Sequence, residues 1–376
     1  MEPASNKITS YLWALLALAL GLGACHALAI HSHCWEGLHP HCFIRWDSGL
    51  YLDIAKHGHT LLPCDEDPNK WCGNAGWAPL YPYMVRALHF LTPLSWEWSA
   101  VWVAWAGMAA SLWLLARMAQ GLSWQDQGFL FAAMLVAPGS IYFYAAFPLS
   151  WTLFLSLGLL HGLWQGKRYW AWISAILLVW IYSIGFVFLF LLAGLSVYTW
   201  SIDEPRPLRK LSQQALGLGI LSMLALFVFE WISTGQWNAT FLVQAKYGHT
   251  LNQPLKFMGI HAQRLLDSWG GITRFIEIQH FGIWAFWLLF AITCRPKQRT
   301  WVSTLSYFAI FALFVLWALP YGASPDVALY RNAALGAPFW IWLVIQQPKA
   351  QRWLWLLFFG ICWGPMAVLF FQSILI

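Results

Sequence analysis

The chain has 376 residues, of which 60% are hydrophobic, 18% aromatic and only 10% charged, with 29 tryptophans and a mean hydropathy of +0.57. Soluble domains carry about 25% charged residues, because most of their surface faces water. The composition therefore excludes a soluble or disordered chain, and the net charge of +6 is too small for this length to indicate nucleic-acid binding. Continuous apolar runs of about 18 to 25 residues predict an all-α polytopic membrane protein rather than a transmembrane barrel.

The first apolar run extends from Tyr11 to Ile30 and follows a short N-terminal segment that contains Lys7. It is longer than the apolar part of a secretion signal, so we interpret it as an uncleaved first span. Gly23 and Ala24 leave a cleavable signal as the alternative.

A large first loop, residues 31–98, contains four of the seven cysteines. They form two sequence pairs, each with seven intervening residues: Cys34 with Cys42, and Cys64 with Cys72. Two local disulfides in an oxidising compartment are the simplest interpretation, although the sequence leaves the connectivity open. The alternative is a metal site, because four histidines surround the first pair: His31, His33, His39 and His41. Their spacing matches no standard zinc module, so we favour the disulfides over the metal site.

The same loop contains the densest polar motif, RWDSGLYLDIAKHG at residues 45–58, followed by WAPLYP at residues 77–82. We predict a short interfacial helix in which Asp47 accepts backbone N–H bonds as the N-cap and Gly58 ends the helix in a left-handed turn. Its apolar stripe comprises Leu50, Tyr51, Ile54 and Ala55. A carboxylate fixed there, beside an apolar membrane surface, is also well placed to accept a proton from a bound hydroxyl.

Later spans are predicted near residues 99–116, 126–145, 148–165, 212–234, 280–294, 301–319, 333–347 and 353–374. The segment 169–200 is too long for one straight span and is interrupted at Ser183, Ile184 and Gly185, so we predict two short helices there. The result is a single domain, residues 1–376, with eleven transmembrane helices.

The basic residues predict the orientation of this domain. Twelve of the 21 fall in short loops on one side, which the positive-inside rule makes cytoplasmic: Lys7, Arg117, Lys167, Arg168, Arg206, Arg209, Lys210, Arg295, Lys297, Arg299, Lys349 and Arg352. The large loops, residues 31–98, 235–279 and 320–332, then lie on the extracytoplasmic or luminal side. Most histidines and acids lie in or beside these loops, so a functional site is expected on that face.

The pattern Trp-Asp-Ser-Gly-x-Tyr-x-x-Ile-Ala-x-x-Gly with a later Pro-Leu-Tyr-Pro resembles the first luminal loop of the PIG-V-like mannosyltransferases. This family includes the second mannosyltransferase of GPI-anchor assembly and bacterial relatives, and belongs to the GT-C membrane glycosyltransferases. The resemblance implies a GT-C-like fold, a polyprenyl-phosphate sugar as donor and Asp47 as the catalytic residue. It also implies that Trp46 and Tyr51 shape the site, whereas the position of Asp53 looks variable in the family.

Weaker similarity extends over most of the chain. Residues 235–248 resemble the family loop in which Gln precedes Trp-Gly-Arg; Gln244 matches, whereas Tyr247 and His249 replace the Trp and the Arg. The segment that ends in Tyr330 and Arg331 resembles the family's Arg-Tyr segment with the two residues in the other order.

The chain departs from the family pattern in two segments. Relatives tend to carry an acid where this chain has Leu149, and often carry Arg-Pro-x-Gly where it has Tyr182, Ser183, Ile184 and Gly185. The departures imply a rebuilt site, a different substrate or a member without catalytic activity.

The expected chemistry needs a base and a cation, because a lipid-linked phosphate is already a good leaving group. Asp47 suits the base, and arginine's planar fork best holds the departing phosphate, so Arg331 is the first choice for that role. Its alternative role is a snorkelling arginine at the membrane interface. Further donor-binding candidates are Arg45, Lys246, His249 and Gln244, and further site-shaping candidates are His57 and Trp77.

The sequence thus predicts an inverting transferase that moves a hexose, with mannose first, from a polyprenyl phosphate to a glycolipid, glycan or protein acceptor. It predicts no resident cofactor, and it leaves a divalent ion and an accessory subunit open. The alternatives are a non-catalytic homologue that binds or transports lipid or glycan, and a membrane metal or redox protein. A transporter is less favoured because the chain lacks a clear repeat and has few deep ionisable residues.

Overall fold

The computed structural model describes residues 4–34, 39–137, 139–183, 185–201, 206–247, 256–267 and 334–372, with Arg331 and short pieces between residues 277 and 309. In these residues nearly all regular structure is helical, and the sheet has two strands. Four helical stretches are long and apolar enough to cross a membrane: Lys7–His31, Trp96–Met118, Pro207–Thr234 and Lys349–Phe371. These features fit the predicted class of all-α integral membrane protein.

The bundle is built from helices of 9 to 29 residues that follow one another along the chain. They are α1 (Ala4–His31), α4 (Trp96–Met118), α5 (Trp124–Leu135), α6 (Leu149–Gln165), α7 (Arg168–Ile181), α8 (Val187–Ser201), α9 (Arg206–Thr234), α15 (Ala337–Ile345) and α16 (Lys349–Phe371). Two short 3-10 turns, η2 (Ser140–Phe143) and η4 (Ala334–Gly336), precede α6 and α15.

Shorter elements form the loops. The first loop contains η1 (Pro40–Phe43), α2 (Ser48–His57), β1 (Leu61–Pro63), β2 (Trp71–Gly73) and α3 (Leu80–Leu91). The second large loop contains α10 (Ala239–Lys246) and α11 (Lys256–Asp267).

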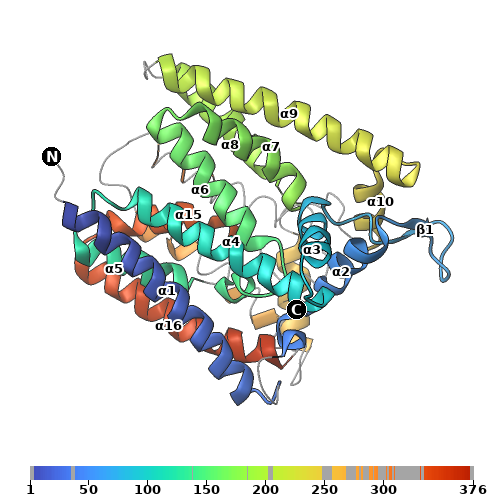
Figure 1. The fold of residues 1–376 in the computed structure, drawn as a ribbon, viewed down its shortest axis with the longest axis horizontal. Helices are drawn as coiled ribbons and strands as arrows, with labels where there is room; N and C mark the ends of the chain where they lie inside the picture. The colour runs from blue at the N-terminus through green and yellow to red at the C-terminus, as the bar shows by residue number, and fades with distance from the viewer. Residues whose placement is uncertain are drawn as a thin grey trace.

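The long helices pack in a continuous series across the molecule (Figure 1). Helix α1 contacts α4, α5 and α16 on one flank, α6 contacts both α4 and α7, and α9 covers α7 and α8 on the other flank. The first loop lies at one end of this bundle beside α10, whereas α1 begins at the other end. The site predicted in the first loop is therefore held at one end of the helices.

Two disulfides brace the first loop. Cys34 is bonded to Cys42, with Cα atoms 5.8 Å apart, and Cys64 to Cys72, with Cα atoms 5.0 Å apart. The first ties the segment after α1 to η1, and the second joins the antiparallel strands β1 and β2. Both predicted disulfides are confirmed, and each links neighbours in sequence. No cluster of three or more metal-ligating side chains occurs among the described residues.

The predicted interruption near residue 184 is confirmed, because α7 ends at Ile181 and α8 begins at Val187. The predicted span at residues 126–145 is wrong. Helix α5 ends at Leu135, and the chain turns through Gly139, whose φ of 75° is left-handed. The apolar residues that follow are almost completely buried in protein rather than facing lipid, and hydropathy does not distinguish these two environments.

Several predicted features lie outside the described residues. They are most of the spans at residues 280–294 and 301–319, the third large loop apart from Arg331, and His249. The predicted count of eleven helices stays a prediction.

Two connections predicted on the cytoplasmic side meet at the end of the bundle where α1 begins. Arg352 forms an ion pair with Asp126, which links the start of α16 to the start of α5. Beside this pair, Lys349 Nζ lies 3.1 Å from Gln125 Oε1. These two contacts bring charged residues from distant parts of the sequence together at one end of the bundle.

Helices α6 and α7 approach so closely that only glycine fits at their contact. A Cβ atom at Gly162 would lie 2.4 Å from the backbone nitrogen of Ala171. Small residues allow such approach in membrane bundles, where close packing drives helix association.

We expect Gly162→Ala to lower the free energy of unfolding by about 1–3 kcal/mol, because the new methyl group overlaps the α7 backbone. Gly217→Ala on the exposed face of α9 is the matched control, since its Cβ meets nothing within 4 Å. Melting temperatures in detergent micelles measure both effects. A Gly162→Ala variant as stable as the Gly217→Ala variant would contradict the close contact.

Candidate functional site

Asp47 and Arg331 meet at the end of the bundle that carries the first loop. The Oδ2 atom of Asp47 lies 2.5 Å from Nη1 of Arg331, although 284 positions separate them in sequence. The two side chains are only 26% and 18% exposed. The two residues that the sequence selected as base and phosphate-binding cation are thus in direct contact.

The prediction that the Asp47 carboxylate caps α2 is wrong. Asp47 occupies the N-cap position, but its side chain makes no capping hydrogen bond. Its backbone is helical, with φ of −59° and ψ of −16°, whereas a side-chain cap usually needs an extended N-cap residue. The carboxylate pairs with a guanidinium instead, which is a stronger partner than a backbone N–H group.

Helix α2 is fixed firmly enough to position Asp47. Its inner face, including Tyr51 and Ile54, is buried, and Arg86 of α3 closes its C-terminal end by donating to the carbonyls of Ala55 (2.6 Å) and Ile54 (3.2 Å). Gly58 follows with the positive φ expected from the sequence, 91°, but its ψ of −171° is extended, so the predicted left-handed turn does not form. The buried face and the contact with Arg86 therefore hold the helix in place, and its C-terminal end is fixed at Gly58.

Trp46, directly before Asp47, has φ of 44°, a left-handed conformation that costs a non-glycine residue about 1–2 kcal/mol. Its indole packs edge-to-face on Phe370, with ring centres 5.7 Å apart. Such strained residues persist only where the surroundings determine them, and they concentrate at functional sites. The packing of Trp46 against α16 thus fixes the direction in which the Asp47 side chain points.

Aromatic side chains enclose the Arg331 guanidinium. It lies 5.5 Å from the ring centre of Phe147 and is hydrogen-bonded to the phenol of Tyr182. Burial opposes the charge on Arg331, but Asp47 and then Tyr182 outweigh this effect and raise its pKa well above the usual value. The pKa of the Tyr51 phenol is also raised well above its usual value, by burial and then by Tyr182 and Asp47, so Tyr51 is neutral at pH 7.

The segment at residues 75–77 lies between α10 and the interruption after α7. The Gly76 carbonyl accepts hydrogen bonds from Gln244 Nε2 (3.1 Å) and Ser183 Oγ (3.0 Å). Trp77 packs edge-to-face on Tyr247, with ring centres 6.2 Å apart. Burial, and then the nearby Asp47 carboxylate, raise the pKa of Tyr247. The second large loop therefore reaches the surroundings of Asp47.

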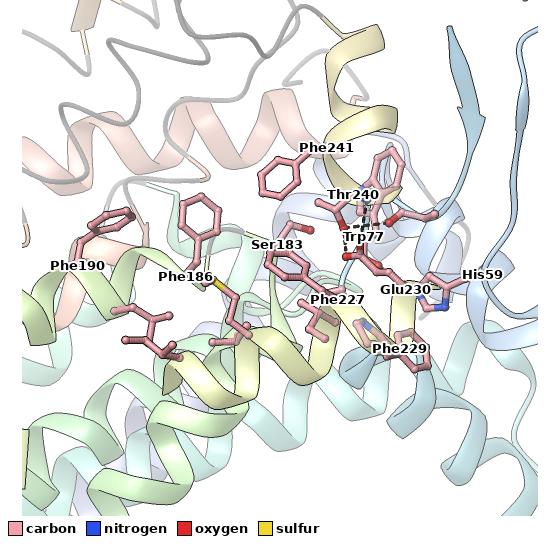
Figure 2. A pocket seen from close by; sticks show the side chains of 18 of the residues that line it. His59, Trp77, Ser183, Phe186, Phe190, Phe227, Phe229, Glu230, Thr240 and Phe241 are labelled. Carbon is pink, nitrogen blue, oxygen red and sulfur yellow. Dashed lines mark hydrogen bonds between the residues drawn. The ribbon is translucent and has the colours of Figure 1, made fainter. Parts of the chain in front are cut away.

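A cavity of about 470 Å³ begins at this segment and extends along the helices (Figure 2). Its walls are almost entirely apolar: Trp77 lies at one end, Phe186 and Phe190 lie on the α8 side, and Phe227 lies on α9. The polar lining residues are His59, Ser183, Glu230 and Thr240. The Glu230 carboxylate accepts hydrogen bonds from the Thr240 hydroxyl (2.7 Å) and backbone nitrogen (3.1 Å). The volume falls in the range of ordinary ligand sites.

Three of the residues predicted at the site form contacts of their own elsewhere. Arg45 donates to the carbonyls of Phe370 (3.4 Å) and Phe371 (3.0 Å) at the end of α16. Lys246 Nζ lies 3.2 Å from Cys72 Sγ in the second disulfide. His57 lies on the exposed face of α2 with its Nδ1 atom 2.8 Å from Asp53 Oδ1. The structure thus brings Asp47, Arg331 and Tyr51 together and gives these three basic residues other partners.

Three site residues were not predicted: Phe147, Tyr182 and Glu230. The first two lie in the segments where the sequence departs from the family pattern, and this departure was the available signal. Leu149, the departing residue itself, is fully buried at the start of α6. Glu230 is an acid near the end of a predicted span, and an ionisable residue at such a position indicates a functional site.

Comparison with known protein families finds no family model that matches the chain, and comparison with curated proteins finds no significant match. The family resemblance of the first loop therefore stays a prediction.

Asp47→Asn and Arg331→Gln should each lower the free energy of unfolding by about 1–3 kcal/mol, because each leaves a partly buried charge or polar group without its partner. The double variant should lose less than the sum, with a coupling energy of about 1–3 kcal/mol. Chemical or thermal unfolding of the four proteins in one detergent measures the cycle. Strictly additive losses would show that the two side chains do not interact.

Proposed function

We propose that the chain is a GT-C-like membrane glycosyltransferase of eleven helices that transfers a hexose, with mannose the first choice, from a polyprenyl phosphate to an acceptor. The site faces the extracytoplasmic or luminal side of a bacterial inner membrane or the endoplasmic reticulum. The observation that carries the proposal is the contact between Asp47 and Arg331 close to an apolar cavity. This contact supports a site in which Asp47 is the base, Arg331 is the phosphate-binding cation and the cavity binds lipid.

Arg331 suits the donor phosphate. A phosphate offers the guanidinium two oxygen acceptors in the same planar arrangement as a carboxylate, so it competes with Asp47 for the same N–H groups. A carboxylate paired with arginine is a weak base, because the positive charge favours its ionised form. Binding of the donor phosphate to Arg331 would therefore release Asp47 and make it a better proton acceptor.

The cavity suits the lipid part of the donor. Its rings and aliphatic walls match an isoprenoid chain, and each buried methylene-sized group contributes about 0.8 kcal/mol. Ser183 lines the cavity, and its neighbour Tyr182 is hydrogen-bonded to Arg331. Arg331 itself does not line the cavity, so a lipid phosphate at Arg331 would send its chain past Tyr182 and Ser183 to reach the apolar walls.

In the proposed step, an acceptor hydroxyl attacks the anomeric carbon from the face opposite the phosphate. The bond from that carbon to the phosphate oxygen breaks, its electron pair stays on the phosphate at Arg331, and the hydroxyl proton passes to Asp47. One displacement inverts the anomeric carbon. Trp46, Tyr51 and Trp77 supply the rigid aromatic walls that orient the sugar.

The departures from the family pattern fit a rebuilt site. Phe147 covers the guanidinium and Tyr182 binds it, so an aromatic ring and a phenol stand near the ion pair. These groups add no charge, and Asp47 remains the carboxylate paired with Arg331.

The second candidate function is a non-catalytic protein that binds or transports lipid or glycan. The same ion pair favours it, because a carboxylate that stays paired with arginine performs no proton transfer. The apolar cavity serves either function.

Asp47→Asn should reduce sugar transfer at least about 100-fold, because general-base catalysis contributes about that much or more. The assay is transfer from radiolabelled polyprenyl-phosphate mannose into total lipid and protein by the purified protein. Asp67→Asn is the matched control, since Asp67 pairs only with Lys70 (3.5 Å) among the basic side chains of the described residues and lies in the exposed turn between β1 and β2. Wild-type protein that binds the donor yet transfers no sugar to any acceptor would favour the second candidate.

A further inference from the structure

Helices α1, α5 and α16 lie side by side (Figure 1). Residues of all three line a second large cavity, near the ends at which α5 and α16 begin. Its volume is about 600 Å³, and no part of the proposed transfer reaction uses it. Trp13, Phe129 and Leu356 contribute apolar surface, one from each helix, whereas Lys349 and Arg352 contribute positive charge. The cavity thus combines an apolar interior with a basic group of residues.

The charges of this cavity do not cancel. Arg352 is paired with Asp126, which also accepts a hydrogen bond from the Ser123 hydroxyl (2.8 Å). Lys349 Nζ contacts the neutral Gln125 Oε1 at 3.1 Å, and no carboxylate of the described residues lies within 4 Å of it. The ammonium group of Lys349 therefore leaves one positive charge, and the N-termini of α5 and α16 add partial positive charge.

The surroundings of the cavity are typical of a membrane interface. Trp124 and Trp353 line it with 62% and 63% of their surfaces exposed, and Trp353 packs edge-to-face on Phe129 at 6.4 Å. Indole rings concentrate where hydrocarbon meets lipid headgroups. A ligand of this site would therefore have an apolar part in the bilayer and a polar part at its surface.

We propose that this cavity binds one anionic phospholipid, with its phosphodiester on Lys349 and Gln125 and an acyl chain against Trp13, Phe129 and Leu356. The single negative charge of a phosphatidylglycerol headgroup matches the single uncompensated lysine, whereas the choline of phosphatidylcholine brings a second positive charge to it. The lipid would bridge α1, α5 and α16 and strengthen their contacts. The inference does not depend on the transferase activity.

Binding should appear as stabilisation, because a ligand of the folded state raises the melting temperature. The purified full chain in neutral maltoside micelles is titrated with dioleoyl phosphatidylglycerol or dioleoyl phosphatidylcholine, and native mass spectrometry counts the retained lipids. We expect one phosphatidylglycerol retained, and a larger rise in melting temperature than phosphatidylcholine gives.

Lys349→Gln should weaken phosphatidylglycerol binding about five-fold, the effect of one basic residue near an anionic lipid, and leave phosphatidylcholine binding unchanged. Lys167→Gln is the matched control, because Lys167 is an exposed lysine between α6 and α7 that does not line the cavity. Ala132→Phe tests the apolar part independently, since it fills the cavity without changing its charge, and should reduce the binding of both lipids.

Three results would overturn the proposal. They are equal phosphatidylglycerol affinity in the wild type and Lys349→Gln, equal stabilisation by the two lipids, and stabilisation by inorganic phosphate as large as that by phosphatidylglycerol. The last result would mean that the cavity binds a free anion and that its apolar walls play no part.

Discussion

The ion pair between Asp47 and Arg331 is the interaction on which the arrangement of the candidate site depends. It joins the first loop to the residues that precede α15, across 284 positions of sequence. Neighbouring aromatic residues hold each partner in place. Trp46, which precedes Asp47, is held in a left-handed conformation against Phe370, and Phe147 covers the guanidinium of Arg331. Because both charges are largely shielded from water, each needs the other or a substitute of the same charge.

This need for a substitute links structure to the proposed chemistry. A lipid-linked phosphate is the kind of anion that can replace the carboxylate at Arg331, and the apolar cavity close by suits its chain. The base would then become active only when the donor is bound, so that acceptor hydroxyls are not deprotonated without a sugar to receive them. The cavity at the other end of the bundle has a different design, with one uncompensated lysine and a rim of exposed indoles.

The sequence predicted local features well and distant contacts unevenly. Helix α2, its end at Gly58, both disulfides and the break after α7 follow from patterns within a few residues. Asp47 and Arg331 were chosen for their chemistry, and the structure brings them together. The predicted span at residues 126–145 was wrong because hydropathy does not distinguish apolar residues buried in protein from apolar residues that face lipid. The places of Tyr182 and Glu230 depend on how distant segments pack, which no local pattern encodes.

The most direct measurement of the central claim is the dissociation constant of polyprenyl-phosphate mannose for the wild type and for Asp47→Asn. If the donor phosphate and Asp47 compete for Arg331, removal of the carboxylate's charge should tighten donor binding about five-fold or more while sugar transfer is lost. Weaker donor binding by Asp47→Asn would contradict the account, because it would mean that the carboxylate helps to hold the donor rather than competing with it.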